Sequence, residues 1–257
     1  MRAACCEATV LSHEVIADDI RLLRVLWPDR DHAPHAGQFF TLRAWGADEA
    51  PFLSRPISVH KWDAETQTVE FLYAVVGEGT RKLTALKKGD SFQLTGPMGN
   101  GFDIASLTRT YKKFAVVGGG IGTAPMYQVA RELAAAGCKP DVFFGFRDKP
   151  YCMEEYRSIA NLVKVSTDTG RVGFHGFVTQ LYDPADYDAV LVCGPTVMMK
   201  NAARLCAEKN TPCFVSLEKK MACGIGACLG CTCETKGGEG KSVCKNGPVF
   251  DATEVFF

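Results

Sequence analysis

Four cysteines near the C-terminus restrict what this chain can fold into more than any other feature. Cys223, Cys228, Cys231 and Cys244 follow the spacing C-x4-C-x2-C-x12-C, which is typical of loops that hold a [2Fe–2S] cluster through four thiolates. Three of the six residues between the first three cysteines are glycine, and glycines let a backbone wrap closely around inorganic sulfide. The spacing therefore predicts an electron-transfer centre.

The same thiols also fit two other arrangements, a structural zinc site or disulfides. Structural zinc usually takes two close cysteine pairs, and here only Cys228 and Cys231 have C-x2-C spacing. Twelve cysteines would suggest disulfides in a short secreted protein, whereas a cytosolic enzyme keeps them reduced or uses them as metal ligands. Cys233 lies close to the loop without a predicted role. The remaining cysteines show no ligand spacing and are interpreted as free thiols or small core residues: Cys5, Cys6, Cys138, Cys152, Cys206 and Cys213.

Length and charge narrow the classes of partner. A chain of 257 residues is expected to form two modules with a small appended one. Lysine plus arginine equals aspartate plus glutamate, at 29 each, so the sequence carries no charge excess for nucleic acid or an anionic membrane. The N-terminus has no apolar signal segment, and no later run reaches membrane-spanning length. We therefore expect a cytoplasmic protein that binds small molecules and another protein.

The hydrophobic pattern divides the chain into three parts. Short apolar or alternating runs separated by turn residues predict an antiparallel β-barrel domain over residues 1–101; the clearest are residues 20–27, 38–43, 57–62, 69–76 and 91–94. Strands and helices then alternate, which predicts an open parallel α/β domain over residues 102–215. Residues 216–257 are predicted to form a small module, which is too short to hold a core without its cluster. The predicted fold class is multidomain, β plus α/β.

A glycine-rich turn marks a candidate nucleotide site in the α/β part. The turn covers residues 118–125 and follows the predicted strand 114–117. Its glycines let the backbone approach a pyrophosphate, and Pro125 suits the first turn of a helix. A second strand end, Cys193-Gly194-Pro195, should lie at the same edge of the sheet. Either turn alone is compatible with a purely structural role. Arg147 and Asp148 follow the next strand, where groups that recognise ribose often lie. They are equally compatible with a solvated turn.

The barrel part contains two candidate phosphate-binding motifs. Arg55-Pro56-Ile57-Ser58 combines a guanidinium fork with a nearby hydroxyl, and Gly77-Glu78-Gly79-Thr80 offers backbone N–H groups that no side chain obstructs. Either motif alone is compatible with an exposed turn. Their combination with the glycine-rich turn and the cysteine loop favours a role in phosphate binding for both motifs.

The order of these motifs resembles the ferredoxin–NADP reductase superfamily. The shared pattern is a barrel with Arg-x-x-Ser and Gly-x-Gly-Thr, followed by Gly-x-Gly-x-Gly-x-x-Pro and Cys-Gly-Pro. Within the superfamily, residues 221–231 and 243–250 closely resemble the electron-transfer subunits of NAD-dependent, class 1B dihydroorotate dehydrogenases. The resemblance covers essentially the whole chain, and the tail is its most specific part.

The resemblance implies which residues bind each cofactor. FAD would be held by Arg55, Pro56, Ile57, Ser58, Leu72, Tyr73, Ala74, Gly79 and Thr80. NAD would be received by Gly120, Gly122, Thr123, Gly194 and Pro195, with Cys193 as the catalytic residue at that edge. The superfamily usually has an aromatic residue in place of Ile57, so this chain departs from the pattern there.

The predicted cofactors imply a relay and a partner. A nicotinamide exchanges two electrons and a [2Fe–2S] centre exchanges one, so a flavin between them must handle both. No remaining stretch is long enough for a substrate domain. The resemblance implies an FMN-containing dihydroorotate dehydrogenase catalytic subunit as partner, in a hetero-oligomer with two copies of each chain, serving pyrimidine synthesis with electrons passing from FMN through the cluster and FAD to NAD⁺. Lys219 and Lys220 are interpreted as a solvated face that can also help docking.

Two alternative functions stay open at this point. One is a flavin and iron–sulfur reductase subunit of a hydrogenase, a sulfide-linked enzyme or a ferredoxin-dependent complex. The other is a non-enzymatic binding module that holds zinc.

Overall fold

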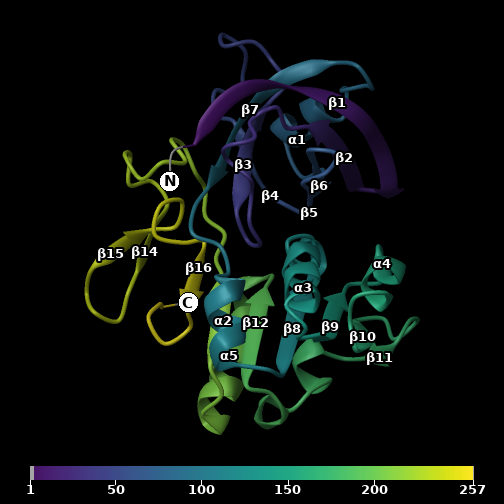
Figure 1. Cartoon of the computed structure of the whole chain (residues 1–257), viewed down its shortest axis with the longest axis vertical. Coiled ribbons are helices and arrows are strands. Elements are labelled where there is room, and N and C mark those ends of the chain that lie inside the picture. Colours follow the sequence, from purple (N-terminus) through teal and green to yellow (C-terminus); the bar gives the residue numbers. More distant parts are fainter. Residues whose placement is uncertain (1–2, 257) are drawn as a thin grey trace.

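The N-terminal half of the chain folds as a curved antiparallel sheet. The computed structural model describes residues 3–256; Met1, Arg2 and Phe257 lie outside the described residues. The strands and helix of this half are β1 (Ala4–Ala17), β2 (Ile20–Leu26), β3 (Phe39–Arg43), β4 (Arg55–Ser58), β5 (Lys61–Asp63), β6 (Thr68–Ala74), α1 (Glu78–Leu83) and β7 (Ser91–Met98). The strand order is β4-β3-β7-β1-β2-β6-β5, and the sheet curls so that β4 also contacts β6 (Figure 1). The predicted antiparallel barrel is confirmed.

Residues 57–62, predicted as one strand, form parts of two. β4 pairs with β3, whereas β5 pairs with β6 on the other edge of the sheet. The chain turns between them because Val59 N–H donates to Gln38 O at 2.9 Å and His60 N–H donates to Glu70 O at 2.9 Å. This corner places His60 against the second half of the molecule.

The second half is a mostly parallel sheet covered by helices on both faces. Its elements are α2 (Ile104–Thr110), β8 (Phe114–Gly119), α3 (Met126–Ala135), β9 (Asp141–Phe146), α4 (Met153–Arg157), β10 (Leu162–Thr167), β11 (Phe174–His175), β12 (Ala189–Cys193), α5 (Thr196–Lys209) and β13 (Cys213–Ser216). Apolar residues of α2 and α3 pack on one face and those of α5 on the other. The fully buried strands β8 and β12 lie in the middle, as expected for a sheet covered on both sides. The predicted open α/β sheet is confirmed.

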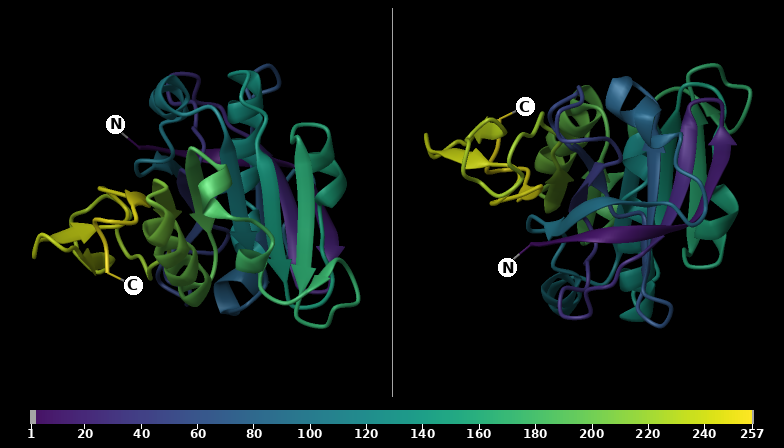
Figure 2. Two further views of the ribbon diagram at one scale, coloured as in Figure 1. Left: turned by 90° about the horizontal axis from the view of Figure 1, so that it is seen from below. Right: turned by 90° about the horizontal axis from the view of Figure 1, so that it is seen from above.

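The C-terminal segment stands beside the parallel sheet and also joins it. It contains a hairpin of β14 (Thr232–Glu234) and β15 (Gly240–Ser242), followed by β16 (Val249–Asp251). β16 pairs antiparallel with β13 and so becomes the edge of the second sheet, while the hairpin projects to one side (Figure 2). Val243, Phe250 and Val255 of this segment are buried in the same apolar cluster as α5. The module therefore shares its core with the sheet.

Side chains of α3 fasten the two halves together. Gln128 Oε1 accepts a hydrogen bond from Trp62 N–H at 3.0 Å, and Arg131 donates to Trp62 O at 2.8 Å. Glu132 Oε1 accepts from Ala36 N–H at 2.9 Å. Each bond joins the helix to the backbone of the barrel, so the helix fixes how the halves meet.

Among residues 3–256, no helix is both long enough and apolar enough to cross a lipid bilayer.

The barrel core should be sensitive to loss of its central aromatic residue. Phe40 is 0% exposed and meets Trp27 and Phe71 edge-on, at centroid distances of 4.9 and 5.6 Å. We expect Phe40→Ala to lower the free energy of unfolding by about 3–5 kcal/mol, because it removes a ring and leaves a cavity. Urea unfolding followed by tryptophan fluorescence measures this. Phe52→Ala is the control, since Phe52 is 74% exposed. Equal stability of the two variants would contradict the assignment of this core.

Candidate functional site

The first candidate site is a cavity of about 430 Å³ between the two halves. One wall is built from β4 and β6, which the fold brings side by side. The rest of the lining comes from the glycine-rich turn and from the segment that leads out of β13. The structure brings together most of the residues predicted for FAD, as lining residues of this cavity: Arg55, Pro56, Ile57, Ser58, Leu72, Tyr73, Ala74 and Thr80.

Arg55 has a free hydrogen-bond donor in this cavity. Its Nη2 donates to Leu53 O at 2.6 Å, whereas its Nε is buried and has no hydrogen-bond partner within residues 3–256. A buried unsatisfied N–H costs free energy, and an anionic group in the cavity would satisfy it. Gly79 does not line the cavity, but a Cβ there would lie 2.8 Å from Arg55 Cδ. Gly79 thus leaves the room that the Arg55 side chain occupies.

Thr80 uses its hydroxyl to close the turn before α1. The Oγ1 accepts from Val76 N–H and Gly77 N–H, both at 3.0 Å, and donates to Gly77 O at 2.9 Å. These three bonds shape the Gly-x-Gly-Thr turn. Thr80 therefore lines the cavity and also stabilises the turn through its hydroxyl group.

Tyr73 is held by a histidine that the sequence analysis missed. His13 Nδ1 lies 3.0 Å from Leu86 O and must donate to it, because a carbonyl oxygen only accepts. In the neutral ring the other nitrogen, Nε2, then accepts from Tyr73 O–H at 3.0 Å. Burial raises the pKa of Tyr73 well above its usual value. The ring that lines the cavity is therefore fixed in place and stays protonated.

The two glycine-containing turns of the α/β half abut each other. A Cβ on Gly122 would lie 2.5 Å from Gly194 Cα and 2.6 Å from Cys193 O, so only glycine allows this approach. Thr123 is buried and donates from its Oγ1 to Gly120 O at 2.8 Å. The predicted turn and the predicted strand end thus form one continuous surface at the carboxyl edge of the sheet.

A second cavity, of about 380 Å³, opens beside these turns. Gly120 and Pro195, two of the residues predicted for the nicotinamide nucleotide, line it, whereas Gly122, Thr123, Cys193 and Gly194 do not. Arg147 also lines it, but Asp148 instead accepts from Thr169 at 2.7 Å and pairs with Arg171 at 3.1 Å. Other lining residues were not found by sequence analysis. Ser166, Asp168, Phe177 and Thr179 come from distant segments, and Val197 and Asn201 lie in α5, just after the predicted Pro195.

Cys193 lines neither of these two cavities. It is 2% exposed, and its pKa is raised mainly by burial and further by the charge of Glu218, against a smaller lowering by a hydrogen bond with Ser216. The thiol is therefore protonated at neutral pH. Ser216 and Glu218 line the first cavity and were not predicted. Ser216 ends β13 and Glu218 follows it, and neither belongs to a recognisable sequence motif.

The four predicted cluster cysteines gather around one loop as two pairs. The Cys228 N–H donates to Cys223 Sγ, and the Cys244 N–H donates to Cys231 Sγ. Within residues 3–256, no group of three or more potential ligands converges on a single metal position. Four thiolates in two pairs can bind a cluster with two iron atoms, with two thiolates to each iron.

Each of the four sulfurs also accepts a backbone N–H. The donors are Cys228 to Cys223 at 3.4 Å, Gly230 to Cys228 at 3.5 Å, Cys244 to Cys231 at 3.4 Å and Gly226 to Cys244 at 3.1 Å. Burial would raise the pKa of Cys223, but the backbone N–H groups of the loop lower it to about 6. Burial and the contact with Cys231 raise the pKa of Cys244 to about 12. The loop thus presents N–H donors that would stabilise thiolate ligands.

Cys233 does not join the four. Its thiol is 3% exposed and donates to Lys241 O at 3.4 Å across the hairpin. It is a buried residue of β14.

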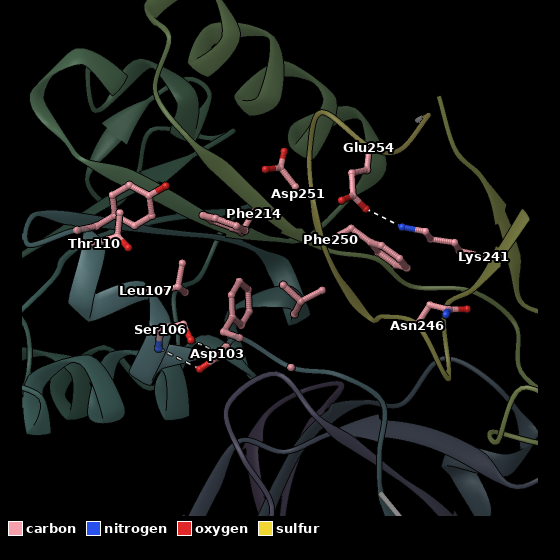
Figure 3. A pocket seen from close by; sticks show the side chains of 14 residues that line it. Asp103, Ser106, Leu107, Thr110, Phe214, Lys241, Asn246, Phe250, Asp251 and Glu254 are labelled. Atoms are coloured by element: carbon pink, nitrogen blue, oxygen red, sulfur yellow. Dashed lines mark hydrogen bonds and ion pairs between the residues drawn. The ribbon is translucent and has the colours of Figure 1, made fainter. Parts of the chain in front are cut away.

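A separate cavity of about 510 Å³ lies between α2, the edge of the second sheet and the hairpin (Figure 3). The ion pair of Lys241 and Glu254, at 2.8 Å, lies at its rim. None of the residues predicted for a site lines it.

Comparison with known proteins agrees with this arrangement. Residues 218–256 match the family model described as the iron-sulfur cluster binding domain of dihydroorotate dehydrogenase B. The chain is 47% identical over 219 residues, 85% of each chain, to the electron transfer subunit of dihydroorotate dehydrogenase B (NAD(+)) of Clostridium acetobutylicum. It is 40% identical over 256 residues, 98% of each chain, to that of Caldanaerobacter subterraneus subsp. tengcongensis.

Solved structures show the same fold. A chain from the structure of NADH-dependent reduced ferredoxin-NADP oxidoreductase superposes with a TM-score of 0.84 at 29% identity, over 97% of this chain and 89% of that one. The ferredoxin reductase of carbazole 1,9a-dioxygenase, at 20% identity and a TM-score of 0.66 over 82% of this chain and 68% of that one, shares the fold. Identity of 40–47% over most of both chains, with the matching tail model, decides the assignment. The chain therefore belongs to the family of electron transfer subunits of dihydroorotate dehydrogenase B (NAD(+)).

Proposed function

We propose that this chain is the electron-transfer subunit of an NAD-linked dihydroorotate dehydrogenase in pyrimidine synthesis. In this role it connects an FMN-containing catalytic subunit to NAD⁺ through a [2Fe–2S] cluster and FAD. One observation carries the proposal. The first cavity, which we assign to the flavin and call the flavin cavity, is lined both by the glycine-rich turn and by the segment 216–221 that continues into the cysteine loop.

The residues at the cavities have distinct tasks in this proposal. Arg55, Ser58, Gly79 and Thr80 with their strand neighbours hold FAD, whose chemistry is exchange of electrons in pairs with a nicotinamide or singly with an iron–sulfur centre. Gly120, Gly122 and Pro195 receive the nicotinamide nucleotide, and Cys193 with Gly194 and Thr123 shapes that edge. Cys223, Cys228, Cys231 and Cys244 hold the cluster.

The proposal includes an organisation for the chain and its complex. Residues 1–101 bind FAD, residues 102–215 bind NAD, and residues 216–257 carry the cluster and lend β16 to the sheet of the second part. The complex contains two copies of each subunit and works in the cytoplasm. The names of the relatives support the pairing with a catalytic subunit, since they are called electron transfer subunits.

A second candidate function is supported by a solved structure. The chain superposes over nearly its whole length on part of NADH-dependent reduced ferredoxin-NADP oxidoreductase, which favours a reductase subunit of a ferredoxin-dependent complex. Binding to the dihydroorotate-oxidising subunit separates the two candidates. The wild-type chain should bind that subunit in the first case and should not in the second.

The cysteine loop should hold one [2Fe–2S] cluster. Anaerobically purified protein should contain close to two iron atoms and two acid-labile sulfides per chain, because the four cysteines form two pairs. Iron and sulfide analysis with visible absorption measures this. Cys233→Ser should retain the cluster and serves as the matched control. Stoichiometric zinc in place of iron would show that the assignment is wrong.

Arg55 should contribute strongly to FAD binding. We expect Arg55→Ala to weaken binding by about 1.5–3 kcal/mol, because a charge-assisted hydrogen bond to a phosphate is lost. Titration of the flavin-free protein with FAD, followed by flavin fluorescence, measures the change. Arg157→Ala is the control, since the Arg157 side chain is 64% exposed and pairs only with Glu154 among the described residues. An unchanged FAD affinity in Arg55→Ala would remove Arg55 from the site.

A further inference from the structure

The end of β7 packs against the cysteine loop beside its first ligand. Met98 is 5% exposed, and its Sδ lies 2.6 Å from the position that a Cβ on Gly224 would take. Gly224 directly follows the predicted ligand Cys223. Its φ is +71°, a conformation that glycine adopts without strain. The Met98 thioether is therefore in close contact with the backbone of the loop, and a side chain at position 224 would separate the two.

Asn100 holds the segment that follows the last ligand, Cys244. Four hydrogen bonds join this one residue to residues 245–249, and both its side chain and its backbone take part. They run from Asn100 Nδ2 to Lys245 O and Asn246 O at 3.1 and 3.2 Å, from Asn100 N–H to Gly247 O, and from Val249 N–H to Asn100 O at 3.2 Å. The backbone next to the ligand is thus fastened to the end of the barrel.

The same end of β7 borders the flavin cavity through Phe39. Phe39 lies opposite Met98 in the pairing of β3 with β7, and it lines the flavin cavity. It also lies beside Gly99, where a Cβ would be 3.1 Å from Phe39 Cε1 and 2.7 Å from Gly247 O. One layer of packing therefore joins the cavity wall to Met98, and the next joins Met98 to the cysteine loop.

We propose that Met98 and Asn100 are positioning residues that fix the iron–sulfur site relative to the flavin cavity and so set the rate of electron exchange between them. The inference rests on the proposed function, in which electrons pass between FAD and the cluster. The two contacts lie next to Cys223 and Cys244, which belong to different cysteine pairs. Together they hold both pairs against the barrel, whereas β13 and β16 anchor only the ends of the segment.

The electron exchange can be started from the nicotinamide side without a partner protein. NADH gives a hydride to FAD and leaves as NAD⁺, and the cluster then takes one electron from the reduced flavin while the second electron stays on the flavin. No covalent bond forms or breaks in the step from flavin to cluster. Its rate therefore depends on the separation of the two groups and on the packing between them.

Anaerobic stopped-flow reduction by NADH tests this role. The holoprotein is mixed with NADH, and the reduction of FAD and of the cluster is followed as two phases. Asn100→Ala should slow the cluster phase about tenfold, because a small displacement of the reacting groups is costly, while the iron content and the FAD phase stay as in wild type. Met98→Ala should act in the same way, whereas Met98→Leu should keep the wild-type rate, since leucine fills a similar volume. Asn161→Ala is the matched control, because it also removes an exposed side-chain hydrogen bond, to Asp141 at 2.8 Å.

A spectroscopic signature separates positioning from general stability. A paramagnetic cluster accelerates the relaxation of a nearby flavin radical, and the effect falls steeply with distance. In Asn100→Ala the EPR signal of the flavin radical should therefore saturate at lower microwave power than in wild type. A purely structural role would lower the melting temperature and leave this saturation unchanged.

The outcomes separate this inference from the proposed function. A wild-type chain whose cluster is not reduced by NADH would overturn the proposed function. Wild-type cluster reduction whose rate is unchanged in Asn100→Ala and Met98→Ala would overturn the positioning role alone. Loss of the cluster from both variants, or equal slowing of the FAD phase, would also overturn it, because the two residues would then act on cluster binding or on hydride transfer.

Discussion

Hydrogen bonds from α3 to the barrel backbone determine how the two nucleotide-binding parts meet. Backbone groups of the barrel that would otherwise be unsatisfied form hydrogen bonds with the side chains of Gln128, Arg131 and Glu132. From the barrel side, His60 Nδ1 donates to Ala124 O at 2.7 Å. An unpaired buried polar group is costly, so these bonds specify one arrangement. α3 begins directly after the glycine-rich turn, and His60 closely follows the Arg55 motif. The same contacts therefore hold the flavin cavity and the nucleotide turn together.

The cysteine loop is tied to the same cavity by chain continuity. β13 ends at Ser216, which lines the flavin cavity, and the following residues lead through Met221, another lining residue, to Cys223. The antiparallel pairing of β13 with β16 anchors the other end of the module. Moving the cluster site away from the cavity would require breaking this edge of the sheet. The segment that carries the cysteine loop is thus anchored by β13 before it and by β16 after it.

Sequence patterns predicted the local motifs and missed the long-range partners. The cysteine spacing, the glycine-rich turn and Arg55 could be recognised because each depends on a few neighbouring residues. His13 pairs with Tyr73 from 60 residues away, and Asp168 and Phe177 reach the second cavity from other segments; no local pattern marks such contacts. Residues 57–62 read as one strand because alternation does not reveal that the chain changes partner strands at His60. The pairing of β16 with β13 was hidden for the same reason, since three residues carry little pattern.

Coupled turnover in the reconstituted complex tests the central claim most directly. The holoprotein would be combined with the dihydroorotate-oxidising subunit, and dihydroorotate-dependent reduction of NAD⁺ compared between wild type and Cys228→Ala at equal amounts of assembled complex. The account predicts that the wild-type complex forms NADH, whereas the assembled Cys228→Ala complex forms it only at background rate while still oxidising NADH with an artificial acceptor. Coupling at the wild-type rate in assembled Cys228→Ala would contradict transfer through the cysteine loop.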